Sequence, residues 1–124
     1  MKTLIVVALL AVLGWSTPGF AQANNASLLG NYVVTGTETS GKAYDGPGPL
    51  AITMDKSGVL HLIWDNGKYL GIGQVVGNQL AVATNAEGKA VLMLMDIKPD
   101  GSLEGKWWQR TDAGTKGTEV WKKK

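Results

Sequence analysis

The sequence predicts an all-β fold, a small antiparallel meander of about eight strands that forms a closed or nearly closed barrel. Turn signals such as Asp-Gly and Asn-Gly recur at intervals of about nine to thirteen residues from Asp55 onward, which is the spacing of short strands joined by hairpins. Apolar and polar residues alternate between these turns, as expected of strands with one buried face. A two-sheet β-sandwich is the alternative architecture.

The predicted strands follow one another through short turns, apart from one long loop. That loop spans residues 36–49 and is rich in Gly, Ser, Thr and Pro. Closing the sheet would remove the exposed edges that promote aggregation. Glycines inside strands occur where a barrel wall bends or a large ring needs room, and here they are Gly36, Gly71, Gly73 and Gly105. The strands are expected at residues 30–37, 50–55, 59–64, 68–76, 79–84, 89–97, 102–110 and 115–122.

The alternation also assigns faces within the strands. In the strand at residues 59–64, one face carries Leu60, Leu62 and Trp64. The strand at residues 89–97 is apolar on both faces until Asp96, so we expect it to be the best covered. In the last strand Val120 and Trp121 compete for the inward side, and the pattern alone leaves both open.

The first 23 residues have the pattern of a cleavable secretory signal peptide. Lys2 precedes an apolar run at residues 4–13, and Ala21-Gln22-Ala23 offers small residues before a cleavage site. The run is shorter than the ~20 residues that span a bilayer, so we expect no stable membrane anchor after cleavage; a retained anchor is the alternative. Residues 24–124 are expected to form a single β-barrel-like domain.

The composition restricts the environment and the partners. The chain has no cysteine, so neither a lipid-modified cysteine nor a disulfide is available, and an apolar core must provide the stability. Its net charge is +2, and charges of both signs are scattered except for three lysines at the end. Nucleic-acid binding requires a larger basic face, so we expect no nucleic-acid partner. The simplest source is a Gram-negative bacterium, with the protein periplasmic or secreted.

Several short motifs carry a resemblance across most of residues 24–124. They are Y-x-V-x-G, Y-x-G, W-x-x-G with G-x-G, D-G-S-L-x-G-x-W and G-T-E, filled here by Tyr32, Val34, Gly36, Tyr44, Gly46, Trp64, Gly67, Gly71, Gly73, residues 100–103, Gly105, Trp107 and residues 117–119. The sequence thus resembles a group of short exported bacterial all-β proteins of unknown function, some labelled fibronectin-binding. Its closing strand and strand rhythm are also similar to avidin-like and lipocalin-like barrels. The resemblance implies an exported barrel and assigns no site residue.

Histidine and cysteine, two residue types that often carry catalysis, are nearly absent. His61 is the only histidine, and no cysteine exists to act as a nucleophile. Asp65 follows His61 by four residues, which is roughly 13 Å along an extended strand. We therefore interpret His61 as a polar residue on a half-exposed face. Without a Cys/His cluster or an acidic calcium loop, the sequence predicts no enzyme activity, no metal site and no cofactor.

Aromatic residues are the remaining candidates for function. Trp64, Tyr69 and Trp107 are the predicted ligand-binding residues, because Trp64 and Trp107 alternate with inward-facing leucines and would line a cavity at one mouth of a barrel. They would otherwise fill a packed core. Trp108 shares the opposite face with Arg110. An exposed Trp beside Arg is typical of a partner-binding surface, and Arg110 lies close enough in sequence for a cation–π contact. A packed position beneath the loop at residues 36–49 or the C-terminal tail explains Trp108 equally well.

Two classes of function follow from this pattern. In the first, an exported non-enzymatic barrel binds a small apolar ligand in its mouth or a protein through Trp108 and Arg110. In the alternative, the protein is a structural or inhibitor-like component of the cell envelope with a fully packed interior. The presence of an interior cavity larger than the ~300 Å³ of a small ligand site discriminates between them.

Overall fold

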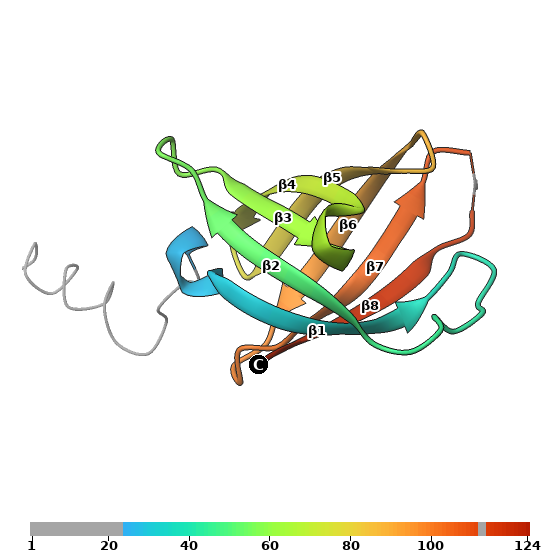
Figure 1. The fold of residues 1–124 in the computed structure, drawn as a ribbon, viewed down its shortest axis with the longest axis horizontal. Coiled ribbons are helices and arrows are strands. Elements are labelled where there is room, and N and C mark those ends of the chain that lie inside the picture. Colours follow the sequence, from blue (N-terminus) through green and yellow to red (C-terminus); the bar gives the residue numbers. More distant parts are fainter. Residues whose placement is uncertain (1–23, 112–113) are drawn as a thin grey trace, which may run out of the picture.

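A computed structural model describes residues 24–111 and 114–124, and the predicted signal peptide lies outside these residues. The chain forms eight antiparallel strands in a closed barrel, in which each strand pairs with the next and the last pairs with the first (Figure 1). The predicted barrel is therefore confirmed, and the sandwich is excluded. The elements are η1 (Asn25–Leu28), β1 (Gly30–Thr37), β2 (Gly48–Met54), β3 (Leu60–Trp64), η2 (Asp65–Gly67), β4 (Tyr69–Val76), β5 (Gln79–Ala86), β6 (Lys89–Ile97), β7 (Leu103–Gln109) and β8 (Gly117–Lys123).

Pairing of β1 with β8 closes the sheet. Six pairs of residues join the two strands, from Tyr32 opposite Lys123 to Thr37 opposite Thr118. This ladder satisfies the backbone groups that would otherwise form two free edges. Among the described residues, no strand of the sheet therefore has an unpaired edge.

Alternation of side chains along each strand builds the core. In β3 the residues Leu60, Leu62 and Trp64 are buried inside the barrel, as the pattern predicts, whereas His61 and Ile63 lie outside and are partly exposed. Inward residues of the other strands complete the interior. The largest side chains with almost no exposure are Trp121, Tyr32, Leu50, Leu60, Leu62, Leu80, Met95 and Leu103.

The prediction that β6 is the best-covered strand is wrong. Val91, Met93 and Met95 point inward and are buried, but Leu92 on the outer face is 50% exposed. A strand with two apolar faces is typical of a sheet covered on both sides. The outer wall of this barrel has no covering layer among the described residues, so the second apolar face of β6 meets solvent.

The two ends of the barrel differ. At one end η1 folds across the opening: the Asn25 side chain donates to the Gly58 carbonyl at 2.8 Å and accepts from the Val75 N–H at 3.0 Å, and Leu28 is buried. At the other end lie the long loop after β1 and the turn after β5, on the right in Figure 1. That turn contains Glu87 and Gly88, both with positive φ (53° and 77°), as two-residue hairpin turns require. This second end carries the candidate site.

Candidate functional site

At the end opposite η1 the barrel interior opens into a cavity of about 550 Å³. The loop between β1 and β2, the η2 turn and the β5–β6 turn form its rim, and inward side chains of the strands form its walls. The interior is therefore packed around Trp121 and Tyr32 but hollow at this end. Trp64, Tyr69 and Trp107, the three predicted ligand-binding residues, all line the cavity.

Three tryptophan and tyrosine rings connect the wall of the cavity to the packed core. Trp64 is 7% exposed and its ring meets Trp121 edge to face, with centroids 6.0 Å apart. Trp121 in turn meets Tyr32 at 6.4 Å. This arrangement settles the competition in the last strand: Trp121 points inward and is fully buried, and Val120 lies on the outer face. Edge-to-face contacts of this kind add to the stability gained from burial alone.

Trp107 has a fixed position at the cavity wall. Its indole N–H donates to the Thr37 carbonyl at 3.2 Å, which connects β7 to the end of β1. Its ring lies over Gly117, where a Cβ atom would collide with the indole. The glycine thus creates the space that the ring occupies, and Trp107 is half-buried rather than enclosed in the core.

Glu119 is the functional candidate that the sequence reasoning missed. It lies on β8 between the inward residues Gly117 and Trp121, lines the cavity, and is only 8% exposed. Its carboxylate accepts one hydrogen bond from the Tyr44 hydroxyl at 2.8 Å and another from Trp121 Nε1 at 2.7 Å. The alternation Gly117, Glu119, Trp121 is the signal that would have found it, once Trp121 is known to face inward.

Glycines stand opposite Glu119 on both neighbouring strands. Glu119 pairs with Gly36 of β1 and with Gly105 of β7. A Cβ atom at Gly36 would collide with Tyr44 and the β8 backbone, and one at Gly105 with the β6 backbone. Both glycines were predicted to give curvature or space for a ring. At Gly36 the space is taken by the Tyr44 ring, which lets its hydroxyl reach Glu119.

Burial dominates the electrostatics of this cluster. It raises the pKa of Glu119 above its usual value, and the hydrogen bonds from Trp121 and Tyr44 oppose that shift only in part. Burial and the adjacent carboxyl group also raise the pKa of Tyr44. Trp64 Nε1 lies near enough to Glu119 to lower its pKa as well, yet it makes no hydrogen bond and is the one described buried side-chain polar atom without a partner.

The raised pKa of Glu119 predicts a specific pH dependence of stability. Folding favours the neutral form of the Glu119 side chain. The contribution of this side chain to the free energy of unfolding is therefore fully present below about pH 4.5, and it is lost as the pH rises through the higher pKa of the folded state. We expect Glu119→Gln, which cannot ionise, to gain free energy of unfolding relative to the natural protein between pH 4.5 and pH 8. Urea denaturation at both pH values measures this difference. An equal difference at the two values would contradict a raised pKa of Glu119.

Trp108 and Arg110 lie on the outer wall, as predicted, but they do not make the predicted contact. Trp108 is half-buried rather than exposed, because it packs beside Leu92, its partner on β6. Both residues border a shallow hollow of about 410 Å³ that continues to Ala83. The cation–π contacts among the described residues are Lys68 with Tyr69 and Lys123 with Tyr32, so Arg110 does not stack on Trp108.

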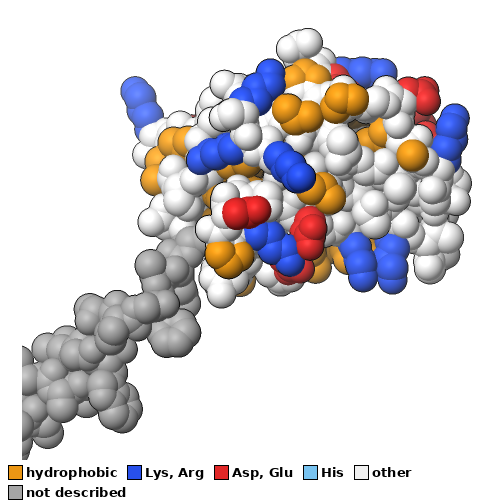
Figure 2. Space-filling model, turned by 90° about the horizontal axis from the view of Figure 1, so that it is seen from below, with side chains coloured by type: hydrophobic (Ala, Val, Ile, Leu, Met, Phe, Trp, Pro, Cys, Tyr) orange, Lys and Arg blue, Asp and Glu red, His pale blue; other side chains and the backbone are white. Residues whose placement is uncertain are grey.

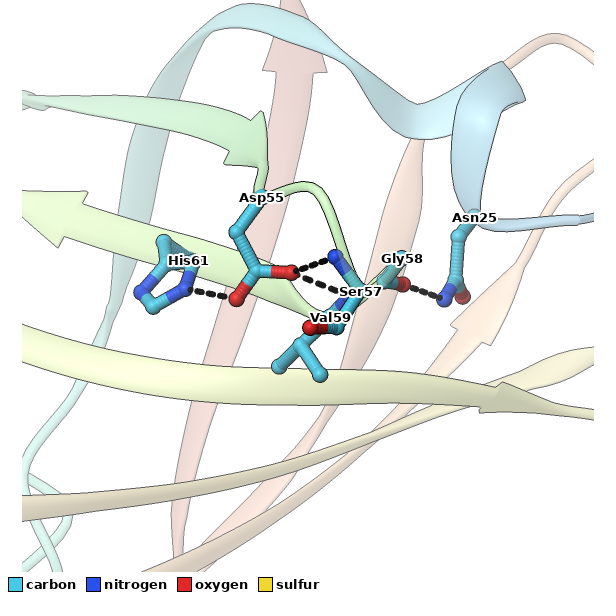
Figure 3. Close-up of polar contacts among 6 residues, drawn as sticks. All are labelled: Asn25, Asp55, Ser57, Gly58, Val59 and His61. Carbon is cyan, nitrogen blue, oxygen red and sulfur yellow. Dashed lines mark hydrogen bonds and ion pairs between the residues drawn. The ribbon is translucent and has the colours of Figure 1, made fainter.

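His61 has a carboxylate partner, but it is not Asp65. Its Nε2 lies 2.8 Å from Asp55 Oδ2, and both side chains are about half exposed. Figure 3 shows Asp55 between His61 on one side and the turn backbone on the other, where its second oxygen accepts from the N–H groups of Ser57 and Val59. These bonds lower the pKa of Asp55, with the His61 contact the largest cause. The pair therefore stabilises the β2–β3 hairpin, far from the cavity.

Comparisons with protein families and with curated proteins identify no relative of this chain. No protein-family model matches this chain, and no curated protein matches it. The resemblance carried by the motifs thus stays a prediction, and the site is interpreted from its own geometry. Within the described ranges, no three His, Asp or Glu side chains are grouped to hold a metal ion, and no helix there is long and apolar enough to cross a membrane.

Proposed function

We propose that this protein is an exported, non-enzymatic β-barrel that binds a small, largely apolar ligand in the cavity at its open end. The cavity carries the proposal, since its volume of about 550 Å³ falls within the ~300–1,000 Å³ typical of small-molecule sites. Trp64, Tyr69 and Trp107 offer ring faces along its wall. The amino-terminal pattern of residues 1–23 supports export to the periplasm or beyond.

The proposal is tested first by native mass spectrometry of the protein isolated from the envelope of its own host. We expect a small molecule to co-purify with the folded chain and to quench tryptophan fluorescence when added back. If no molecule co-purifies and none of three naphthalene probes (an amine, an alcohol and a carboxylate) binds, the alternative of a structural or inhibitor-like envelope protein is favoured.

Paired tryptophan variants locate the site. We expect Trp107→Phe to weaken binding of the co-purified molecule about two- to tenfold, because a ring contact is worth about 0.5–1.5 kcal/mol. Trp108→Phe is the matched control, since this neighbouring indole lies on the outer wall. Fluorescence titration of both variants gives the two dissociation constants. A larger effect of Trp108→Phe would place the ligand outside the barrel.

A protein partner on the outer wall is a second candidate function, and one observation favours it. Ile72, Ala83, Leu92 and Trp108 occupy successive paired positions across β4, β5, β6 and β7. Ile72 and Leu92 are each about half exposed, so this row forms an apolar band on the barrel exterior. Contiguous exposed apolar surface of this kind is typical of interaction sites.

A further inference from the structure

The charged residues that line the cavity are all acidic. They are Glu38, Asp45, Asp65, Glu87 and Glu119, and no Lys, Arg or His is among the lining residues. The chain as a whole has 12 basic and 10 acidic residues. On the face seen in Figure 2, Lys and Arg side chains are interspersed with Asp and Glu, so a lining of one sign is not the general pattern of the surface.

The five acidic residues lie at two depths in the cavity, four on its rim and one in its wall. Four of them are exposed and belong to the rim: Glu38 and Asp45 to the long loop, Asp65 to η2, and Glu87 to the β5–β6 turn. The fifth, Glu119, is buried in the wall. A concave site rimmed with charge of one sign concentrates ligands of the opposite sign. The rim thus attracts cations, and Glu119 offers a carboxylate at close range inside.

The aromatic lining suits the same kind of ligand. Tyr44, Trp64, Tyr69 and Trp107 border the cavity, and the negative face of such rings attracts ammonium groups. One ring already makes this contact, because the Lys68 ammonium lies 5.5 Å from the centroid of Tyr69. A ligand that combines an ammonium group with an apolar body would use both the rings and the carboxylates.

Two further observations separate a ligand site from a mere acidic surface. Glu119 accepts hydrogen bonds from Tyr44 and Trp121, while a carboxylate has about four acceptor positions, so capacity remains for a third donor. Trp64 Nε1, beside the same carboxylate, is buried without a partner, and as an N–H donor it can serve an acceptor atom on the body of a ligand. Such unsatisfied groups are rare and are typical of functional sites. The described acidic groups are not clustered for a metal ion.

We propose that the cavity binds an organic cation, an amine or quaternary ammonium group attached to an apolar body, with the aromatic wall holding the body and the carboxylates of the rim and of Glu119 holding the charge. This inference rests on the proposed ligand-binding function and specifies the class of ligand. It excludes an anionic ligand such as a fatty acid.

Three naphthalene probes of similar shape and different charge test the inference. Isothermal titration calorimetry compares 1-naphthylmethylamine (cationic), 1-naphthylmethanol (neutral) and 1-naphthoate (anionic) at pH 7. We expect the amine to bind about tenfold more tightly than the alcohol and the naphthoate to bind weakest. Raising the salt concentration from about 0.05 M to about 0.5 M should weaken the affinity for the amine severalfold and leave the affinity for the alcohol unchanged.

The outcomes distinguish the inference from the function on which it rests. If the alcohol or the naphthoate binds as tightly as the amine, the inferred preference for an organic cation is wrong, while the proposed ligand-binding function of the cavity is supported. If none of the three binds, the inference of an organic cation is overturned, and the ligand-binding function is overturned with it when no molecule co-purifies with the protein.

Variants connect the preference to the carboxylates. We expect Glu119→Gln to weaken the affinity for the amine about three- to tenfold without changing the affinity for the alcohol. Glu104→Gln is the matched control, because Glu104 is exposed on the outer face of β7, where it pairs with Lys98 at 3.0 Å. If Glu119→Gln does not fold, the exposed rim double variant Glu38→Gln/Glu87→Gln provides the same test. An unchanged ratio of amine to alcohol affinity in the folded variants overturns the inference.

Discussion

Replacing Trp121 by alanine is expected to remove about 3 to 5 kcal/mol from the free energy of unfolding. The indole has no exposed surface and contacts both Tyr32 and Trp64 edge to face, so alanine leaves a void at the centre of the core. The substitution also removes the Nε1 donor from Glu119. A buried carboxyl group that loses a partner adds a further cost.

Thermal and urea denaturation measure the loss, and Trp108→Ala is the matched control. Trp108 lies on the neighbouring strand but is half-buried on the outer wall, so its removal creates no interior cavity. We expect it to cost less than about half as much as Trp121→Ala. Similar losses for the two variants would show that Trp121 is not the centre of the core.

The alternation of apolar and polar residues and the turn signals predicted most of the fold, because the barrel is built mainly from pairs of consecutive strands. Every ladder except that of β1 with β8 joins strands that are consecutive in the sequence, and each pair is set by its own turn and its own alternation. The first strand, residues 30–37, and the sixth, residues 89–97, have the predicted bounds, and the other strand ends differ by no more than two residues.

The candidate site was predicted only in part, for a physical reason. The aromatic residues alternate with leucines, so their inward direction follows from a single strand. Glu119 could not be assigned in this way, because the pattern of the last strand left Val120 and Trp121 both open for the inward side, and because its partner Tyr44 comes from a distant loop. The sequence separation between Tyr44 and Glu119 is 75 residues, and local alternation contains no information over that distance.

The partner of His61 was missed for a related reason. Distance along an extended strand was applied to Asp65, which follows His61, whereas Asp55 precedes it across a tight turn. The hairpin folds the chain back, so six residues of separation become a contact of 2.8 Å. Strand spacing therefore overestimates the distance between residues on opposite sides of a turn.

Gly105→Ala is expected to have the second large effect, a loss of about 3 kcal/mol in the free energy of unfolding. A Cβ atom at this position would overlap the Leu94 carbonyl and the Met95 Cα, which belong to the backbone of β6. Backbone in a paired ladder cannot turn away as a side chain can, so β6 and β7 must separate locally. Because Gly105 also pairs with Glu119, the shift would displace the buried carboxyl group.

Gly73→Ala provides the control for this prediction. Its added Cβ would meet mainly the methyl ends of Leu62 and Leu80 at 3.1 and 3.2 Å, and such side chains can shift by a few tenths of an ångström. We expect Gly73→Ala to cost less than about 1 kcal/mol and to leave binding of the cationic probe unchanged. Gly105→Ala should lower both the affinity for the cationic probe and the free energy of unfolding. Equal losses in the two variants would mean that crowding in general, and not the approach of β6 to β7 beside Glu119, sets the requirement for glycine.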